Sequence, residues 1–273
     1  MNPPRMNSPR RMIWGGMLFL ACLLLATSGC QKLKARDELN KGVQAYKASQ
    51  YQVAIEHFKQ AVELDPTLVN ARLYLATGYA NQYVPGSEAE DNLQKGEQAI
   101  AEFQRVLQMQ GNNIGSVSGI ASLYFQMKRL DQAKEYYLKH IQLEPANPEP
   151  YYSVGVINWT QTYQPRIVLK QRLRLKPEDP ITNAEERGKL AERNNPLLEE
   201  GMQMLNKAME LRQEYDDAMA YLNLLYREKA DLAETPAERD ELINTANSWI
   251  DKALEVKKIK AERALKESSS TGG

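Results

Sequence analysis

The sequence predicts an all-α solenoid built from stacked helical hairpins. Three observations support this fold class. The 273 residues are rich in helix formers, they contain few of the Val, Ile or Thr runs that form sheets, and small and aromatic residues recur at fixed offsets along the chain. The 35 basic and 35 acidic residues balance, which argues against a nucleic-acid-binding protein, because such proteins carry a basic excess. With two Cys and two His, the chain has few side chains that could form a metal site or a disulfide framework.

The N-terminal segment, residues 1–29, is predicted to be an export signal. It contains three arginines and no acidic residue, and an uncharged stretch from Met12 ends in small residues directly before Cys30. This order of a basic region, a short apolar region and small residues is typical of a cleaved secretory signal. The apolar stretch is shorter than a transmembrane helix usually requires, and polar residues follow it directly.

The end of this segment, Thr27-Ser28-Gly29-Cys30, resembles the lipobox of bacterial lipoproteins. In that family the cysteine is acylated and becomes the new N-terminus, so the resemblance implies acyl chains such as palmitate on Cys30 and a stable membrane anchor. Thr27 departs from the leucine that the family prefers. Gln31 follows the cysteine, which resembles lipoproteins sent to the outer membrane of diderm bacteria. The alternative is an ordinary secretory signal in which the cysteine stands by coincidence.

The mature chain repeats itself. Residues 42–66 and 121–145 place a small residue, an aromatic residue, an alanine and a closing proline at the same internal offsets. The small residues, such as Gly42 and Ala54, are expected where two helices cross and their backbones approach closely. Phe58 stands one turn beyond Ala54 on the same apolar face.

This pattern resembles the tetratricopeptide repeat, a 34-residue helix–turn–helix unit, and the resemblance implies a right-handed superhelical solenoid. The spacing of the small residue in the second helix divides residues 35–257 into five units, at about 35–68, 69–113, 114–147, 148–213 and 214–257. Residues 30–34 are expected to form a short linker to the lipid anchor. Residues 258–267 are expected to end the last helix, and residues 268–273 to form a disordered tail.

The fourth unit is longer than its neighbours by about one repeat, between Trp159 and Gly201. Two interpretations stay open. One is a degraded sixth repeat. The other is an insertion over residues 160–200 that extends the first helix and adds a short helix near residues 183–194. We favour the insertion because the stretch that begins at Arg166 has no small residue where two helices of a repeat would cross.

No catalytic or cofactor motif is recognisable, whether a glycine-rich nucleotide loop, an H-E-x-x-H zinc helix or a C-x-x-C pair. His57 and His140 fall in second helices without an acid–base partner at a meaningful spacing, and His140 is expected to pack between repeats. The sequence therefore predicts a protein that is not an enzyme and that holds no cofactor and no metal ion.

The first helices of the predicted units carry aromatic and polar residues on both sides of their small crossing residue. In stacked helical hairpins these helices line the concave surface, where extended partners bind. We therefore expect a groove that holds a protein or peptide partner through Tyr46, Asn81, Phe125, Gln126, Tyr152, Trp159 and Arg227. The alternative is that several of the aromatic residues pack against the neighbouring first helix.

A second candidate surface is a basic stretch, to which an anionic lipid surface would bind. Its residues are Arg166, Lys170, Arg172 and Arg174. Acidic residues follow closely between positions 178 and 186, so a solvated helix with local ion pairs is the preferred interpretation.

Together these features predict a membrane-anchored scaffold on the periplasmic side of a bacterial membrane, with the outer membrane as the expected location. It is expected to bind a protein or peptide, and neither nucleic acid nor a small-molecule substrate. One alternative is an assembly factor of an envelope machine, similar to the repeat-built lipoproteins that serve pilus secretins or outer-membrane protein insertion. A further alternative is the non-catalytic subunit of an enzyme.

Overall fold

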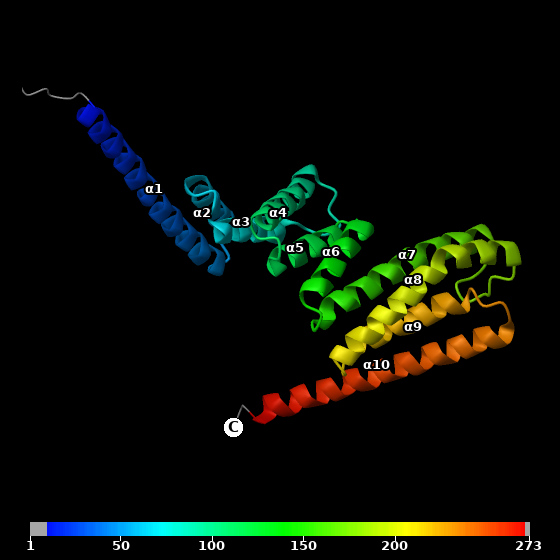
Figure 1. Cartoon of the computed structure of the whole chain (residues 1–273). Coiled ribbons are helices and arrows are strands. Elements are labelled where there is room, and N and C mark those ends of the chain that lie inside the picture. The colour runs from blue at the N-terminus through cyan, green and yellow to red at the C-terminus, as the bar shows by residue number, and fades with distance from the viewer. Residues whose placement is uncertain (1–9, 271–273) are drawn as a thin grey trace, which may run out of the picture. The chain divides into compact units, whose positions relative to one another are not determined.

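The computed structural model describes the backbone of residues 10–270 and the side chains of residues 29–268. This part of the chain contains ten α-helices joined by short turns, and no strand (Figure 1). The all-α fold class predicted from the sequence is confirmed. Most of the predicted export signal, residues 1–29, lies outside the described side chains. Among the residues that are described, no helix is both long and apolar enough to span a membrane.

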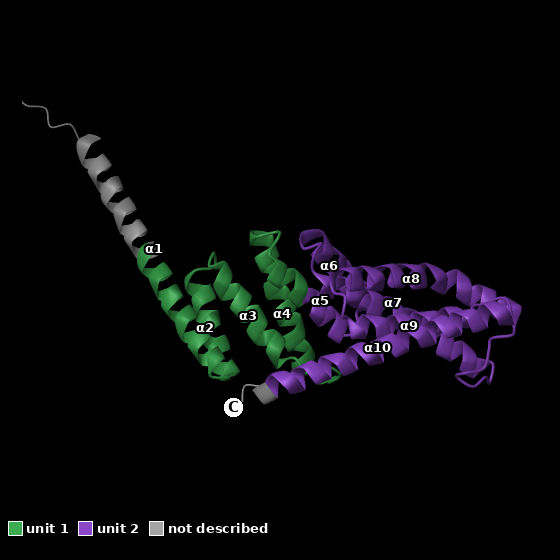
Figure 2. Cartoon of the chain, turned by 90° about the horizontal axis from the view of Figure 1, so that it is seen from below, with its two compact units in different colours: residues 1–119 green, residues 120–273 purple. Residues whose placement is uncertain are grey.

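The chain divides into two compact units, residues 1–119 and 120–273, and the boundary falls within α5 (Ile114–Gln126) (Figure 2). The first helix, α1 (Arg10–Lys47), includes residues 30–34, for which the sequence led us to expect a linker.

The first unit consists mainly of two helical hairpins. α1 pairs with α2 (Tyr51–Leu64), and α3 (Val69–Gln82) pairs with α4 (Glu90–Met109). α2 also packs on α3, so consecutive hairpins stack on each other.

The hairpin of α1 and α2 closes around a glycine. Phe58 of α2 is fully buried, and a Cβ atom on Gly42 of α1 would overlap its ring. Ala54, one turn before Phe58, is also fully buried. The close helix crossing predicted at these small residues is therefore confirmed.

The second unit contains α6 (Leu130–Leu143), α7 (Pro148–Arg172), α8 (Ala184–Leu211), α9 (Asp216–Ala230) and α10 (Pro236–Ser270). α7 pairs with α8, and α9 pairs with α10. α7 and α8 both contact α9, which joins the two hairpins into one stack.

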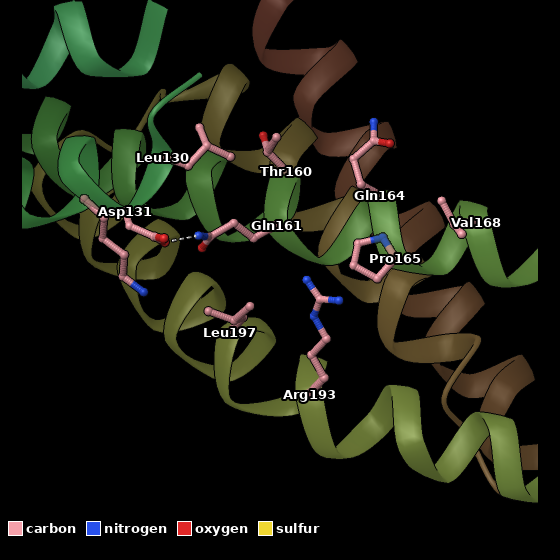
Figure 3. Close-up of a pocket in the computed structure, with 10 residues that line it drawn as sticks. Leu130, Asp131, Thr160, Gln161, Gln164, Pro165, Val168, Arg193 and Leu197 are labelled. Atoms are coloured by element: carbon pink, nitrogen blue, oxygen red, sulfur yellow. Dashed lines mark hydrogen bonds between the residues drawn. The ribbon is translucent and has the colours of Figure 1, made fainter. Parts of the chain in front are cut away.

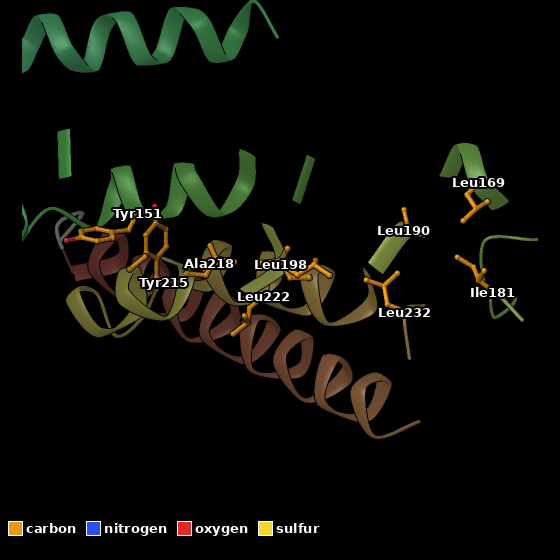
Figure 4. Close-up of a cluster of buried hydrophobic side chains, with 12 residues drawn as sticks. Tyr151, Leu169, Ile181, Leu190, Leu198, Tyr215, Ala218, Leu222 and Leu232 are labelled. Carbon is orange, nitrogen blue, oxygen red and sulfur yellow. The ribbon is translucent and has the colours of Figure 1, made fainter. Parts of the chain in front are cut away.

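The apolar core of the second unit lies along α8 and α9 (Figure 4). Leu198 and Leu205 of α8 and Leu222 of α9 are fully buried, and each such leucine stabilises the fold by about 1.5–3 kcal/mol. Gly155 of α7 faces Leu205 so closely that a Cβ atom would come within 2.5 Å of its Cγ. The second unit therefore uses the same close crossing of paired helices as the first.

The long fourth repeat is a single elongated hairpin. α7 continues to Arg172, and the chain turns before α8 begins at Ala184. The side chain of Asn183 caps α8 by accepting a hydrogen bond from the backbone N of Glu186 (3.1 Å). Both helices of the hairpin are therefore lengthened, and the hairpin contains no sixth repeat.

The short helix expected near residues 183–194 is not a separate element. These residues are the first turns of α8, which continues without a break to Leu211. Pro196 is the one residue that would favour a break there, because it cannot donate a backbone hydrogen bond, and it is accommodated inside the helix.

The last helix begins as its sequence predicts. Pro236 is its first residue, and Thr235 accepts a hydrogen bond on Oγ1 from the backbone N of Glu238 (3.2 Å). α10 continues to Ser270 and so includes the first residues of the predicted tail; residues 271–273 lie outside the described part of the chain.

Candidate functional site

Two predicted groove residues come together in the first unit. Asn81 of α3 donates a hydrogen bond from Nδ2 to Oη of Tyr46 on α1, although the two residues are 35 positions apart. The ring of Tyr46 is half-buried against the core of its hairpin and stands edge-on to Tyr51, with ring centroids 5.3 Å apart. Tyr46 therefore contributes to the core, as the packing alternative expects, while Asn81 is exposed.

Five aromatic side chains of the second unit form one group, which we call the aromatic cluster. Its members are Tyr152, Trp159 and Tyr163 of α7, Tyr215 directly before α9, and Tyr221 of α9. Tyr221 stands edge-on to both Tyr152 (5.6 Å between centroids) and Trp159 (5.4 Å). Tyr152 also contacts Tyr215 (5.1 Å), and Trp159 contacts Tyr163 (5.2 Å). Aromatic rings attract one another at these separations.

The aromatic cluster is neither core nor free surface. Tyr215 is buried, whereas the other four rings are half-buried and keep part of their surface in contact with solvent. Tyr152 and Trp159 thus pack against the neighbouring helix α9, as the packing alternative expects, and still present ring surface, as the groove hypothesis requires.

The hydroxyl groups of Tyr152, Tyr215 and Tyr221 are neutral over the physiological pH range. Burial raises the pKa of Tyr152, Tyr215 and Tyr221 above the ordinary value for tyrosine. Tyr215 also donates a hydrogen bond from Oη to Oε2 of Glu149 (2.8 Å). The surface therefore offers ring faces and neutral hydroxyl groups to a partner.

The remaining predicted groove residues lie on α5 and α9. Phe125 and Gln126 are half-buried on α5, and Gln126 donates from Nε2 to Oγ of Ser122 (3.0 Å). Arg227 donates from Nε to Asn223 Oδ1 (2.9 Å) and from Nη2 to Asn247 Oδ1 (2.7 Å). Arg227 is therefore held by its own α9 and by α10, which occupies part of its hydrogen-bonding capacity.

Two residues of the basic stretch lie in a buried ion cluster. Arg166 contacts Glu228 Oε2 through Nε (2.7 Å) and Asp231 Oδ2 through Nη1 (2.8 Å). Lys170 contacts Asp231 Oδ2 (2.6 Å) and donates to the carbonyl of Pro177 (2.7 Å). The side chains of Lys170 and Glu228 are each 2% exposed. Arg166 and Lys170 are therefore unavailable to an anionic lipid surface, because their charges are neutralised inside the fold.

Burial raises the pKa of Glu228 to about 7, although the nearby charge of Arg166 opposes this shift. The other two residues of the basic stretch stay at the surface. Arg172 forms an ion pair with Glu186, one of the nearby acidic residues that were expected to pair with the basic stretch. Arg174 has a positive φ of 57° and helps to close the turn after α7.

Each histidine has a single carboxylate neighbour. His57 Nδ1 lies 2.6 Å from Glu38 Oε2, and His140 Nε2 lies 2.9 Å from Glu144 Oε2. His140 is buried, which agrees with the packing role expected for it. Within the described residues, neither histidine belongs to a group of three side chains that could hold a metal ion.

An open cleft of about 730 Å³ lies between the first turns of α6 and the elongated α7–α8 hairpin (Figure 3). We call it the α6–α8 cleft. Its lining combines apolar and polar side chains from the three helices, namely Leu130, Asp131, Lys134, Thr160, Gln161, Gln164, Pro165, Val168, Arg193 and Leu197.

Comparison with known proteins identifies one repeat of a known family within the chain. The family model of the tetratricopeptide repeat matches residues 118–147, which cover most of α5 and all of α6. This part of the chain is a tetratricopeptide repeat (TPR), and the fold of the described residues is that of a TPR solenoid. A crystal structure of MamA protein is similar to it with a TM-score of 0.58 at 14% identity, over 84% of this chain and 94% of that chain. MamA from Desulfovibrio magneticus RS-1 is similar with a TM-score of 0.55 at 16% identity, over 82% and 96%.

At these identities the likeness to MamA establishes the fold alone. The comparison with curated protein sequences returned no match. The TPR fold supports a role as a protein-interaction scaffold, and scaffolds of this family are generally non-catalytic.

Several residues of the site were not predicted from the sequence. Tyr163 stands four residues after Trp159, so helical spacing could have indicated it. Tyr215 and Tyr221 join the aromatic cluster only because α7 packs against α9. The α6–α8 cleft depends on the position of the elongated hairpin beside α6, and no local sequence pattern predicts that position.

Proposed function

We propose that this protein is a lipid-anchored scaffold of the bacterial cell envelope that binds a protein or peptide segment through the aromatic cluster. The observation that carries the proposal is that four large rings lie side by side on α7 and α9, half-buried, with part of their surface exposed to solvent. Contiguous exposed apolar surface marks interaction sites, and Tyr and Trp are enriched among the residues that dominate binding energy.

The chemistry of the aromatic cluster indicates the kind of segment it binds. The ring faces favour apolar side chains, and the neutral hydroxyl groups pair with the backbone amides of an extended chain. The carboxylates of Glu149 and Asp217 lie near Tyr152. This placement disfavours an acidic segment at that end of the cluster.

Attachment to the membrane is the second part of the proposal. Cys30 is an exposed, unpaired thiol on α1, and it follows the lipobox-like residues at the end of the export signal. Acylation at this position would hold the repeats at the membrane face to which the chain is exported, and more than one acyl chain is needed for a stable anchor.

The anchor is tested with Cys30→Ser expressed in a diderm bacterium that is fed an alkyne-labelled palmitate. The wild-type chain is expected to incorporate the label and to fractionate with the outer membrane. The variant is expected to lose both properties, because it lacks the thiol that accepts the acyl chain. A Cys30→Ser protein that still carries label in the membrane fraction would show that the anchor is not at this residue.

The binding surface is tested by placing a photo-reactive amino acid at Tyr152 and, as a control on an exposed stretch of α10, at Lys257. Irradiation in intact cells is expected to give a specific cross-linked partner from the first position and none from the second. Trp159→Ala should remove that product while leaving the far-ultraviolet circular dichroism spectrum unchanged. Equal cross-linking from both positions would contradict the proposed surface.

A further inference from the structure

The α6–α8 cleft is separate from the aromatic cluster. Trp159 and Tyr163 lie four positions apart on one face of α7, whereas Gln161, Gln164 and Val168 of the cleft lie about half a helical turn away, on the opposite face. α7 thus carries two surfaces of different chemistry, and most residues that line the cleft lie between positions 160 and 200, in the elongated part of the hairpin.

Part of the lining of the cleft is an apolar surface. Val168 is 60% exposed, which is unusual for a β-branched aliphatic residue inside a helix, and it lies with Pro165 on α7. Leu130 of α6 and Leu197 of α8 complete the apolar lining. An aliphatic side chain of a ligand would cover these groups and remove them from water.

One polar atom beside the cleft has no hydrogen-bond partner among the described residues. Gln161 donates from Nε2 to Asp131 Oδ1 (2.7 Å), as the dashed line in Figure 3 shows. A carboxylate only accepts, so the amide nitrogen must face Asp131 and the amide oxygen must face away. That oxygen is buried and has no partner among the described residues. Pro165 also leaves the backbone carbonyl of Gln161 without its usual helical donor.

The cleft also has a cation that the fold leaves unused. Arg193 of α8 has no ion pair or hydrogen bond within the described part of the chain, and Figure 3 shows its guanidinium group directed toward Pro165 across the cleft. The other cation, Lys134, is already paired with Glu200. Arg193 is therefore the group available to a carboxylate, for which its planar donors are well suited.

We propose that the α6–α8 cleft binds an extended peptide segment that carries an aliphatic side chain and a carboxylate. The aliphatic group covers Val168 and Leu197, and the carboxylate pairs with Arg193. The carboxylate belongs either to an Asp or Glu side chain or to the C-terminus of the partner. The inference rests on the proposed function, a protein that binds peptide segments, and adds a second site to it.

Two displayed libraries of random heptapeptides test the proposal, one with the C-terminus fused to its carrier and one with the C-terminus free. Selection is made on the wild-type chain that begins at Cys30, and the peptide enriched most strongly in each library is then synthesised with a fluorophore. Its binding is measured by fluorescence anisotropy to the wild type and to Arg193→Glu, Val168→Asp and Trp159→Ala. Lys257→Glu serves as the matched charge control, because it makes the same charge change on exposed α10.

The expected result is an enriched peptide with an aliphatic residue and a carboxylate. Arg193→Glu and Val168→Asp should each weaken its binding about tenfold or more, and Lys257→Glu less than about twofold. Enrichment from the fused library assigns the carboxylate to a side chain, and enrichment from the free library alone assigns it to the C-terminus. Arg193 and Val168 are exposed, so circular dichroism should show both variants folded.

Three results would overturn the proposal: no enrichment from either library, enriched peptides without a carboxylate, or binding that is insensitive to both cleft variants. If Trp159→Ala alone removes binding, the peptide occupies the aromatic cluster, so the cleft proposal fails while the proposed function stands. If the cleft variants remove binding and Trp159→Ala does not, the cleft is the peptide site, and the cross-linking experiment at Tyr152 then decides separately whether the aromatic cluster binds a partner.

Discussion

Replacing Arg166 with Met is expected to destabilise the second unit by about 3–5 kcal/mol, the cost of breaking a buried ion pair from one side. The guanidinium group contacts both Glu228 and Asp231, and the Glu228 side chain is only 2% exposed. Its removal leaves Asp231 with Lys170, whereas Glu228 keeps no hydrogen-bonding partner in the described part of the chain. Methionine retains most of the apolar stem, so the loss is mainly electrostatic.

The pH dependence of this loss has a defined sign. The pKa of Glu228 in the folded wild type is about 7, above the ordinary value of 4.5. The folded state therefore binds this proton more tightly than the unfolded state, and the contribution of Glu228 to stability falls as pH rises from about 4.5 to about 7, by at most about 1.4 kcal/mol per pH unit. Without Arg166 the pKa rises further, so Arg166→Met should be least harmful at pH 5 and most harmful at pH 8.

Tryptophan fluorescence during urea unfolding measures the effect. Of the three tryptophans in the sequence, Trp159 and Trp249 belong to the second unit and Trp14 belongs to the predicted export signal, so the mature chain reports on the second unit alone. Arg172→Met is the matched control, because its side chain is 60% exposed and its ion pair should contribute less than about 1 kcal/mol. Equal losses for the two variants, or a loss for Arg166→Met that does not change with pH, would refute the electrostatic account.

Two further predictions use the same unfolding assay. Gly155→Ala should destabilise the second unit by about 1–3 kcal/mol because its Cβ atom would overlap a buried leucine, whereas Gly188→Ala, on an open stretch of α8, should stabilise it by up to about 1 kcal/mol; the same sign for both would contradict the close crossing. Tyr215→Phe should cost about 1 kcal/mol, because it removes the hydrogen bond to Glu149, and an unchanged urea midpoint would show that this bond contributes nothing.

The hairpins of this chain could be predicted from the sequence because their determinants are local. A helix crossing requires a small residue at a fixed position within each repeat, and this spacing is visible in the sequence. Gly42 and Ala54 are buried at the positions that the spacing predicts. The additional residues of the long fourth unit show no such spacing of small residues, because lengthened helices need no small residue at their far ends. The sequence therefore left a sixth repeat and an insertion as alternatives, and packing decided between them.

The partners of the basic stretch could not be predicted because they are distant in the sequence. Reasoning from nearby charges assigns Arg166 and Lys170 to the acidic residues that follow within the same unit, whereas Arg166 pairs with Glu228, 62 positions away on α9. A local ion pair forms only at the exposed end, between Arg172 and Glu186. Charge patterns in the sequence thus located surface pairs and missed the buried ones, which depend on how helix pairs stack.

The elongated α7–α8 hairpin has a consequence for cooperativity. In a linear array of repeats, stability is shared between each repeat and the faces it forms with its neighbours, and the array can separate wherever two repeats meet. An additional repeat would have created one more such place. Two longer helices create no additional interface between repeats. They instead increase the number of packing contacts that must break together when this hairpin opens. Backbone amides along the whole of α7 and α8 should therefore become exposed in one opening event, and their hydrogen exchange should give one common free energy of opening.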